Sequence, residues 1–99
     1  MLLEWSVLAF ADREAIFDYI EADSPRMAIT VDDRIRICVE GLAQFPKMGR
    51  VGRLTGTREL VISGTPYIAA YRIAKDTVRI LRVLHGAQKW PDEMSARPK

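Results

Sequence analysis

The chain has 99 residues, 48% hydrophobic and 28% charged, which is the composition of a folded globular protein and excludes a disordered one. Its length is typical of one folding unit, so we expect a single domain over residues 1–99. The one cysteine, Cys38, excludes an internal disulfide and indicates a reducing cytoplasm. The opening segment lacks a basic region and is interrupted by Glu4, so we expect neither a signal peptide nor a membrane span.

The net charge of +2 conceals an uneven distribution along the chain. Residues 1–46 carry four basic and nine acidic side chains, a balance of −5. Residues 47–99 carry eleven basic and four acidic side chains, a balance of +7. This polarity favours a basic working surface formed by the C-terminal half. The alternative is that the two halves attract each other within the fold.

One short strand and two helices are predicted first. Apolar and polar residues alternate over residues 2–8, which indicates a strand. Asp12 is suited to cap a helix that reaches about Ala22. Ser24 and Pro25 form a strong start for the next helix. An apolar stripe then runs until Pro46 ends the helix, and we expect its residues to be buried: Ala28, Val31, Ile35, Cys38 or Val39, Leu42 and Phe45.

Three strands are predicted in the C-terminal half, after a loop over residues 47–56 that holds three glycines and three basic residues. They lie at about residues 57–63, 67–74 and 77–85, and their short turns predict an antiparallel meander. The first strand of the chain should join an edge of this sheet. The order β-α-α-β-β-β predicts an α+β fold, an antiparallel sheet with two helices packed on one face. We expect the opposite face to be concave, partly open and basic.

Arginines interrupt the apolar run of each of these three strands, although burial of an unpaired guanidinium is costly. We therefore expect them to stay uncovered until an anionic partner binds. Strict alternation places Arg82 on the face of Val78 and Ile80, and Val83 on the other face. The residues predicted to bind such a partner are Arg50, Arg53, Arg58, Arg72, Arg82, His85, Lys89 and Trp90.

Several of these residues have an alternative role. A structural ion pair and a functional contact are both compatible with Arg82, and the loop of Arg50 and Arg53 is either a phosphate clamp or a solvated turn. His85 is able to transfer a proton, although a histidine at a strand end is more often a plain hydrogen-bonding residue. Trp90 is suited to stack on a base, but packing of the tail onto the sheet is the more common role. No metal site or cofactor is expected, because the chain has one histidine and one cysteine and no nucleotide-binding P-loop.

Short motifs in a characteristic order carry a resemblance to a known family. They are Trp5, Asp18-Tyr19-Ile20, Ser24-Pro25, Phe45-Pro46, Gly49-Arg50, Thr57-Arg58-Glu59-Leu60, Pro66-Tyr67-Ile68, Tyr71-Arg72-Ile73 and Ile80-Leu81-Arg82-Val83-Leu84-His85-Gly86. Through them nearly the whole chain resembles the RelE/ParE superfamily of bacterial toxins from type II toxin–antitoxin, or plasmid stabilisation, systems. The resemblance implies a cytoplasmic bacterial protein that arrests growth when free. It also implies a hetero-oligomeric complex with an acidic antitoxin that has a DNA-binding domain.

Two activities occur in that superfamily. RelE-like members cleave mRNA in the ribosome, and the resemblance then implies that His85, Arg82 and Arg72 are catalytic. ParE-like members are taken to poison DNA gyrase and are not enzymes. Tyr67 is followed by Ile68, where many of the nucleases have an arginine, and the typical tyrosine after the last strand is not evident. We therefore favour ParE-like inhibition of gyrase, with the RelE-like endoribonuclease as the alternative.

Overall fold

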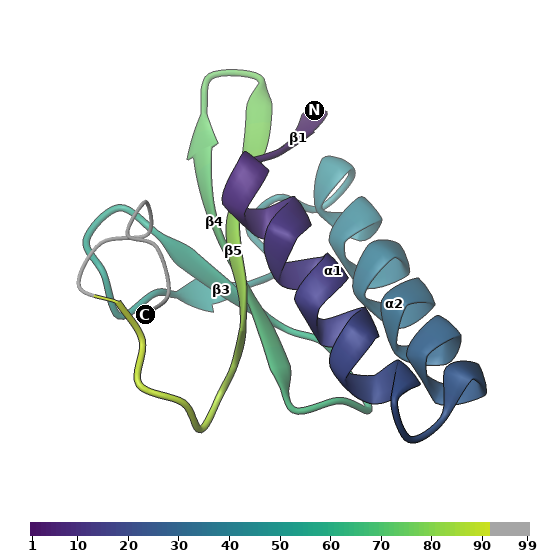
Figure 1. The fold of residues 1–99 in the computed structure, drawn as a ribbon. Helices are drawn as coiled ribbons and strands as arrows, with labels where there is room; N and C mark the ends of the chain where they lie inside the picture. Colours follow the sequence, from purple (N-terminus) through teal and green to yellow (C-terminus); the bar gives the residue numbers. More distant parts are fainter. Residues whose placement is uncertain (92–99) are drawn as a thin grey trace.

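Two helices lie side by side against a five-stranded sheet (Figure 1). The computed structural model describes residues 1–91. Its elements, in chain order, are β1 (Leu2–Trp5), α1 (Val7–Glu21), α2 (Pro25–Glu40), the short 3-10 helix η1 (Gly41–Ala43), β2 (Arg50–Val51), β3 (Arg58–Val61), β4 (Tyr67–Ala74) and β5 (Thr77–His85). Within this part of the chain, no helix is long and apolar enough to cross a membrane.

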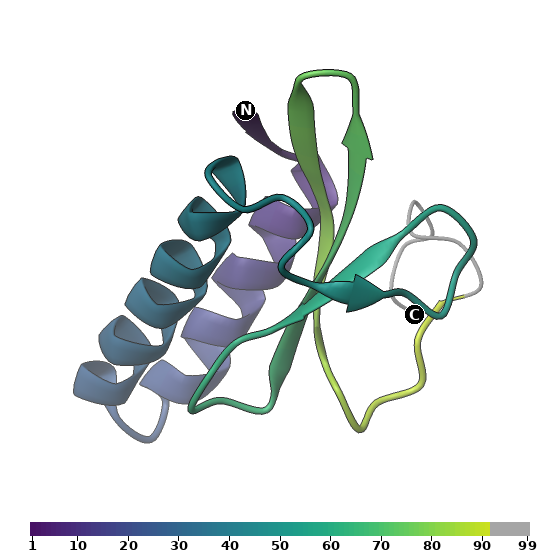
Figure 2. The same cartoon turned by 180° about the vertical axis from the view of Figure 1, so that it is seen from behind.

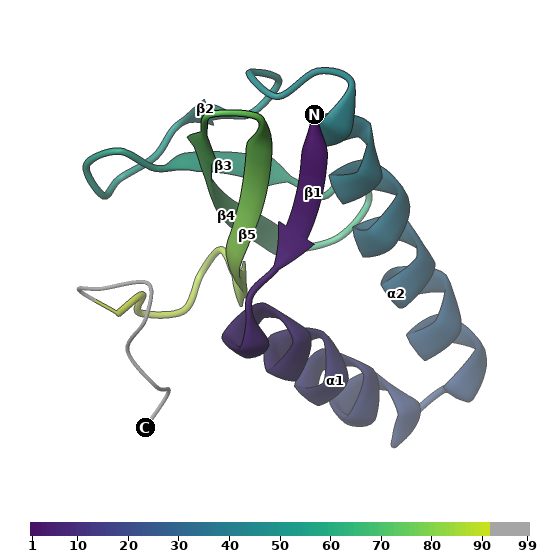
Figure 3. The same cartoon turned by 90° about the horizontal axis from the view of Figure 1, so that it is seen from above.

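The strands lie in the order β1-β5-β4-β3-β2. As predicted, β3, β4 and β5 form an antiparallel meander and β1 joins an edge of the sheet (Figure 3). The sheet is nevertheless mixed, because β1 runs parallel to β5. After η1 the chain crosses to the other edge of the sheet, where β2 pairs with β3 (Figure 2). This strand was predicted as loop, because two residues are too few to show a period.

The start of α1 differs from the prediction. The N-cap is Ser6, whose Oγ accepts a hydrogen bond from the Ala9 amide at 3.0 Å and donates one to the Leu81 carbonyl at 2.8 Å. The prediction of Asp12 as the cap was therefore wrong, and this residue lies inside the helix. The start of α2 is confirmed, since the Ser24 Oγ accepts from the Met27 amide at 3.2 Å.

The apolar stripe of α2 packs into the core as predicted, apart from its last member. Its buried residues are Ala28, Val31, Ile35, Val39 and Leu42, and Cys38 is half-buried against them. The predicted burial of Phe45 is wrong, because this side chain is 59% exposed. The α-helix ends at Glu40, and the tighter winding of η1 changes the direction of the side chains that follow.

A β-bulge shifts the faces of β5. Tyr71 pairs with Ile80 and Ala70 pairs with Arg82, so Leu81 is an extra residue on β5. Val83 consequently joins Ile80 in the core, whereas strict alternation had placed them on opposite faces. Sequence periodicity cannot locate such an insertion, so the predicted faces of β5 were wrong beyond Ile80.

Candidate functional site

Arg82 is not the uncovered cation that the sequence predicted. Its side chain is 1% exposed, and its Nε and Nη2 donate to the two carboxylate oxygens of Asp12 at 2.7 and 2.9 Å. The backbone amide of Val83 also donates to Asp12, at 2.9 Å. The start of α1 at Ser6 places Asp12 beside the bulge, which explains this contact. Arg82 is therefore a structural ion-pair residue, the alternative that its position left open.

Two ion pairs connect the acidic N-terminal half of the chain to its basic C-terminal half. Arg79 pairs with Glu4 of β1, as Arg82 pairs with Asp12 of α1. Both pairs join an arginine of the basic half to a carboxylate of the acidic half. For these two arginines, attraction between the halves explains the charge pattern, and the expectation that they wait for an external anion is wrong.

A second buried carboxylate, Glu59, binds the two arginines of the β2 region. It is 3% exposed and accepts hydrogen bonds from Arg50 Nη2 at 3.1 Å, Arg53 Nε at 3.0 Å and the Arg53 amide at 2.8 Å. Burial by itself raises the pKa of Glu59, but the hydrogen bonds from Arg53 and Arg50 outweigh it and hold this pKa below 4.5. Sequence reasoning missed Glu59, although it is the one acidic residue between Glu40 and Asp76.

The end of the described chain packs onto the same region. The Arg53 guanidinium lies 3.6 Å from the centre of the Trp90 ring, and the Trp90 indole donates to the His85 carbonyl at 3.2 Å. Trp90 thus has the packing role that was its more common alternative. Arg50, Arg53, Glu59 and Trp90 form one group, which we call the arginine–tryptophan cluster.

His85 has the contacts of a hydrogen-bonding residue at a strand end. Its Nδ1 accepts from the Ala87 amide at 3.0 Å, which leaves the proton of the neutral ring on Nε2. Its ring contacts Tyr67 edge-on at 5.6 Å between ring centres. Both contacts orient the imidazole within the end of β5.

The sheet face away from the helices is open only in part. Ile68, Ala70 and Leu84 are buried even though the first two alternate with the core residues of β4. The face is exposed and basic at the part of β4 that carries Arg72. This side chain is exposed and has no ion pair or hydrogen bond within residues 1–91. Its Nε lies 3.9 Å from the position that a Cβ on Gly56 would occupy.

The three residues expected to be catalytic in a nuclease are not brought together. His85 pairs with Tyr67 at one end of β4, and Arg72 lies five residues further along that strand, at a distance of about 17 Å. Arg82 is buried against Asp12. Of the other predicted residues, Arg58 donates to the carbonyls of Lys47 and Gly49, and Lys89 is exposed without an ion pair in the described part of the chain.

Comparison with known proteins shows the family. Residues 3–90 match the family described as the ParE toxin of the type II toxin–antitoxin system parDE. The chain belongs to this family of toxins. The match confirms the resemblance drawn from the sequence motifs, and it implies an antitoxin as partner.

Individual relatives agree with this assignment. The toxin is 45% identical over 89 residues to Y4kP of Sinorhizobium fredii, a candidate toxin by its description, covering 90% of this chain and 92% of the relative. It is 38% identical over 84 residues to toxin RelE2 of Caulobacter vibrioides, covering 85% and 93%. A solved structure of the chromosomal ParDE system from P. aeruginosa matches with a TM-score of 0.77 and 31% identity, covering 84% of this chain and 92% of that one.

Proposed function

We propose that this toxin arrests bacterial growth by inhibiting DNA gyrase in the cytoplasm, and that its antitoxin silences it. The observation that carries the proposal is the separation of the candidate nuclease residues. Cleavage of RNA by acid–base catalysis needs several groups within hydrogen-bond reach of one phosphate. His85 pairs with Tyr67 at the start of β4, Arg72 lies five residues further along that strand, and Arg82 is held by Asp12. Inhibition by binding to a protein target has no such requirement.

The proposed contact surface for the target is the arginine–tryptophan cluster together with Arg72 and Lys89. Arg50 and Arg53 keep side-chain exposures of 57% and 43% although they bind Glu59. Two guanidiniums share one carboxylate there, so the cluster retains a positive charge for an anionic partner. Arginine and tryptophan are also the residue types that dominate binding energy at protein interfaces.

Induction of the toxin without its antitoxin tests the proposal. We expect growth to stop, chromosomal breaks to appear and a translated reporter mRNA to remain intact. Purified toxin should also inhibit supercoiling by DNA gyrase in vitro. Normal growth at high expression of folded toxin would contradict any toxic activity, and arrest without DNA damage would contradict gyrase as the target.

A second candidate function is ribosome-dependent cleavage of mRNA, which the name of the relative RelE2 favours. In that case the reporter mRNA should be cut within translated codons while the DNA stays intact. His85→Ala should then slow cleavage by about a hundredfold or more through loss of acid–base catalysis. Under gyrase inhibition, the same variant should still arrest growth and leave transcripts intact.

A further inference from the structure

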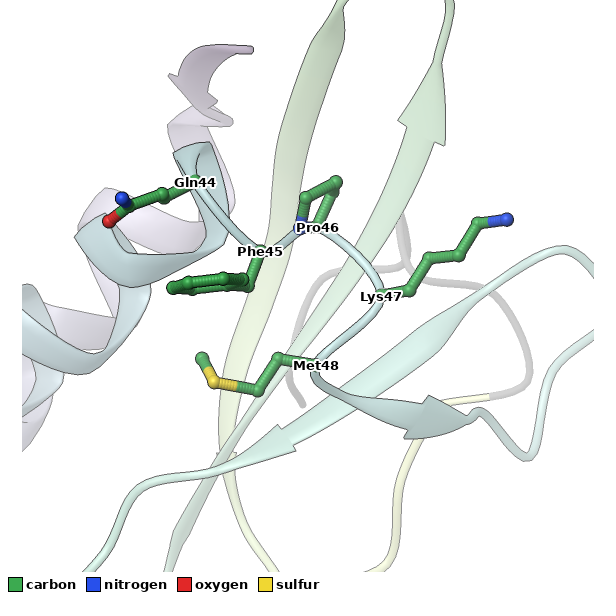
Figure 4. Close-up of a pocket in the computed structure, with 5 residues that line it drawn as sticks. All are labelled: Gln44, Phe45, Pro46, Lys47 and Met48. Carbon is green, nitrogen blue, oxygen red and sulfur yellow. The ribbon is translucent and has the colours of Figure 1, made fainter.

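The segment between η1 and β2 exposes two large apolar side chains. Phe45 is 59% exposed and Met48 is 52% exposed. Their side chains point to the same side of the turn, and Lys47 between them points to the other side (Figure 4). They line an open hollow of about 600 Å³ together with Gln44, Pro46 and Lys47. The volume falls within the range of known pockets, and the hollow is open to solvent rather than enclosed.

The turn that carries this pair is held rigidly by the sheet. The buried hydroxyl of Tyr71 donates to the Pro46 carbonyl at 2.7 Å and accepts from the Gly49 amide at 2.9 Å. Arg58 Nη1 donates to the Gly49 carbonyl at 2.7 Å. Gly49 has no room for a side chain, because a Cβ there would lie 2.6 Å from the Tyr71 hydroxyl.

Rigidity makes the hollow suitable for binding. Burial raises the pKa of Tyr71, although the hydrogen bond from the Gly49 amide and the charge of Arg58 partly oppose the rise, so the hydroxyl remains a donor to Pro46 at neutral pH. A partner that covers Phe45 and Met48 therefore does not have to order this backbone. Surfaces fixed before binding lose less conformational entropy in the complex.

The charges near the hollow indicate the chemistry of the partner. Residues 44–61 of the sequence, which include the turn, β2 and β3, carry four basic side chains and one acidic side chain, a balance of +3: Lys47, Arg50, Arg53, Arg58 and Glu59. Glu40, at the end of α2, is already paired with Arg36 at 3.0 Å. A second copy of the toxin that bound here through the same surface would oppose like charges. An acidic segment would not.

We propose that the antitoxin of this system inserts an apolar side chain between Phe45 and Met48 and sets neighbouring carboxylates beside Lys47 and Arg58. The inference rests on the toxin–antitoxin function proposed above. The residues that line the hollow, among them Phe45 and Met48, are not part of the surface proposed for gyrase, although Arg50 and Arg53 lie near both. The toxin's contribution is an apolar hollow with a basic border. The partner's contribution is an apolar anchor within an acidic segment.

Dissociation of the purified toxin–antitoxin complex tests this site. The probe is the protein encoded by the small reading frame beside the toxin gene, and its exchange is followed against excess labelled wild-type toxin. The double variant Phe45→Ala, Met48→Ala should dissociate at least about tenfold faster than the wild type, because loss of a central apolar contact acts mainly on the dissociation rate. Lys47→Glu should also dissociate faster.

Ile29→Ala is the matched control, because Ile29 is an equally exposed apolar residue of α2, at 56%. It should dissociate at the wild-type rate. Equal rates for the double variant and the wild type, with both folded by circular dichroism, would overturn the proposal. The proposal would also be overturned if the double variant kept its antitoxin affinity but lost self-association in ultracentrifugation. The hollow would then bind a second copy of the toxin.

Growth assays separate failure of this site from failure of the proposed function. The double variant should still arrest growth when induced alone, and co-expressed antitoxin should no longer restore growth fully. If the wild-type toxin does not arrest growth, the proposed toxicity fails while the dissociation experiment still decides the docking site. Full rescue of the double variant by the antitoxin would count against the site itself.

Discussion

At the scale of single residues, the two charged side chains buried within residues 1–91 both have partners of opposite charge. Arg82 is almost fully buried and bound by Asp12, and Glu59 is almost fully buried and bound by Arg50 and Arg53. An ion moved out of water loses its hydration, and a partner at hydrogen-bond distance offsets much of that loss. Arg82, one of the arginines that seemed to indicate an open binding face, is therefore part of the scaffold.

Asp12→Asn tests the ion pair with Arg82. The substitution keeps the size of the side chain but removes the negative charge beside a buried guanidinium, so we expect the free energy of unfolding to fall by about 3 kcal/mol. Urea denaturation followed by circular dichroism measures the loss. The double variant Asp12→Leu, Arg82→Met should be less destabilised, because neither charge is then buried alone. A negligible effect of Asp12→Asn would show that the pair contributes little.

Glu59→Gln tests the pH dependence that the arginines impose. The pKa of Glu59 is lower in the folded chain than its ordinary value of 4.5. Its ionised form therefore stabilises the fold above about pH 4.5, and this stabilisation is lost as the pH falls through the lower folded pKa. Between pH 7 and pH 3, the free energy of unfolding should fall more steeply for the wild type than for the variant. Parallel curves would show that Glu59 does not contribute to acid sensitivity.

At the scale of the elements, the junction between β1 and α1 determines the neighbours of β5. The Ser6 Oγ caps α1 and also reaches the Leu81 carbonyl, at the bulge of β5. Because α1 begins here, its second turn brings Asp12 against Arg82 and Val83. One cap therefore places both the helix and the ion pair.

Ser6→Ala should lower the free energy of unfolding by about 1 to 2 kcal/mol, because it removes the cap and one further hydrogen bond. Thermal unfolding by calorimetry measures the change. Asp12→Ser is the comparison variant. If Asp12 were the helix cap, a serine there would still cap the helix and stability would be kept, whereas loss of the ion pair with Arg82 should lower it. A stable Asp12→Ser variant beside an unaffected Ser6→Ala variant would contradict the observed start of α1.

At the scale of the whole molecule, the uneven charge has two consequences. Glu4 and Asp12 of the acidic half bind Arg79 and Arg82 of the basic half. Positive charge remains near β2 and β3, because residues 44–61 of the sequence hold Lys47, Arg50, Arg53 and Arg58 but a single acidic residue, Glu59. The molecule is thus polar in charge, and long-range attraction should guide an acidic antitoxin toward this end.

The rate of association between toxin and antitoxin should therefore depend strongly on salt. Between about 0.1 M and 1 M salt, the distance over which charges act falls from about 10 Å to about 3 Å, and we expect the association rate to fall by about tenfold. Stopped-flow fluorescence measures this rate. The dissociation rate should change much less, since it depends mainly on contacts already formed. An association rate independent of salt would contradict electrostatic guidance.

Particular residues show how far the sequence predicts the fold and the site. The start of α2 at Ser24 and Pro25, its buried stripe and the bounds of β4 and β5 were correct, because capping, period and turn chemistry are local signals. The faces of β5 beyond Ile80, the burial of Phe45 and the short strand β2 were not predicted correctly. The faces of β5 depend on the bulge, and the exposure of Phe45 depends on the change from α-helix to 3-10 helix. The strand β2 exists only through its pairing with β3.

The amino-acid sequence by itself determined the α+β class with the order of β1, the two α-helices, β3, β4 and β5, the family of toxins and the concentration of positive charge in the C-terminal half. The tertiary structure alone decided which arginines are free to bind a partner. Arg82 and Arg72 have the same side chain on neighbouring strands, yet one is buried against Asp12 and the other is exposed. The reason is physical: the free energy of a charge depends on its burial and on the groups beside it, and residues distant in the chain supply both.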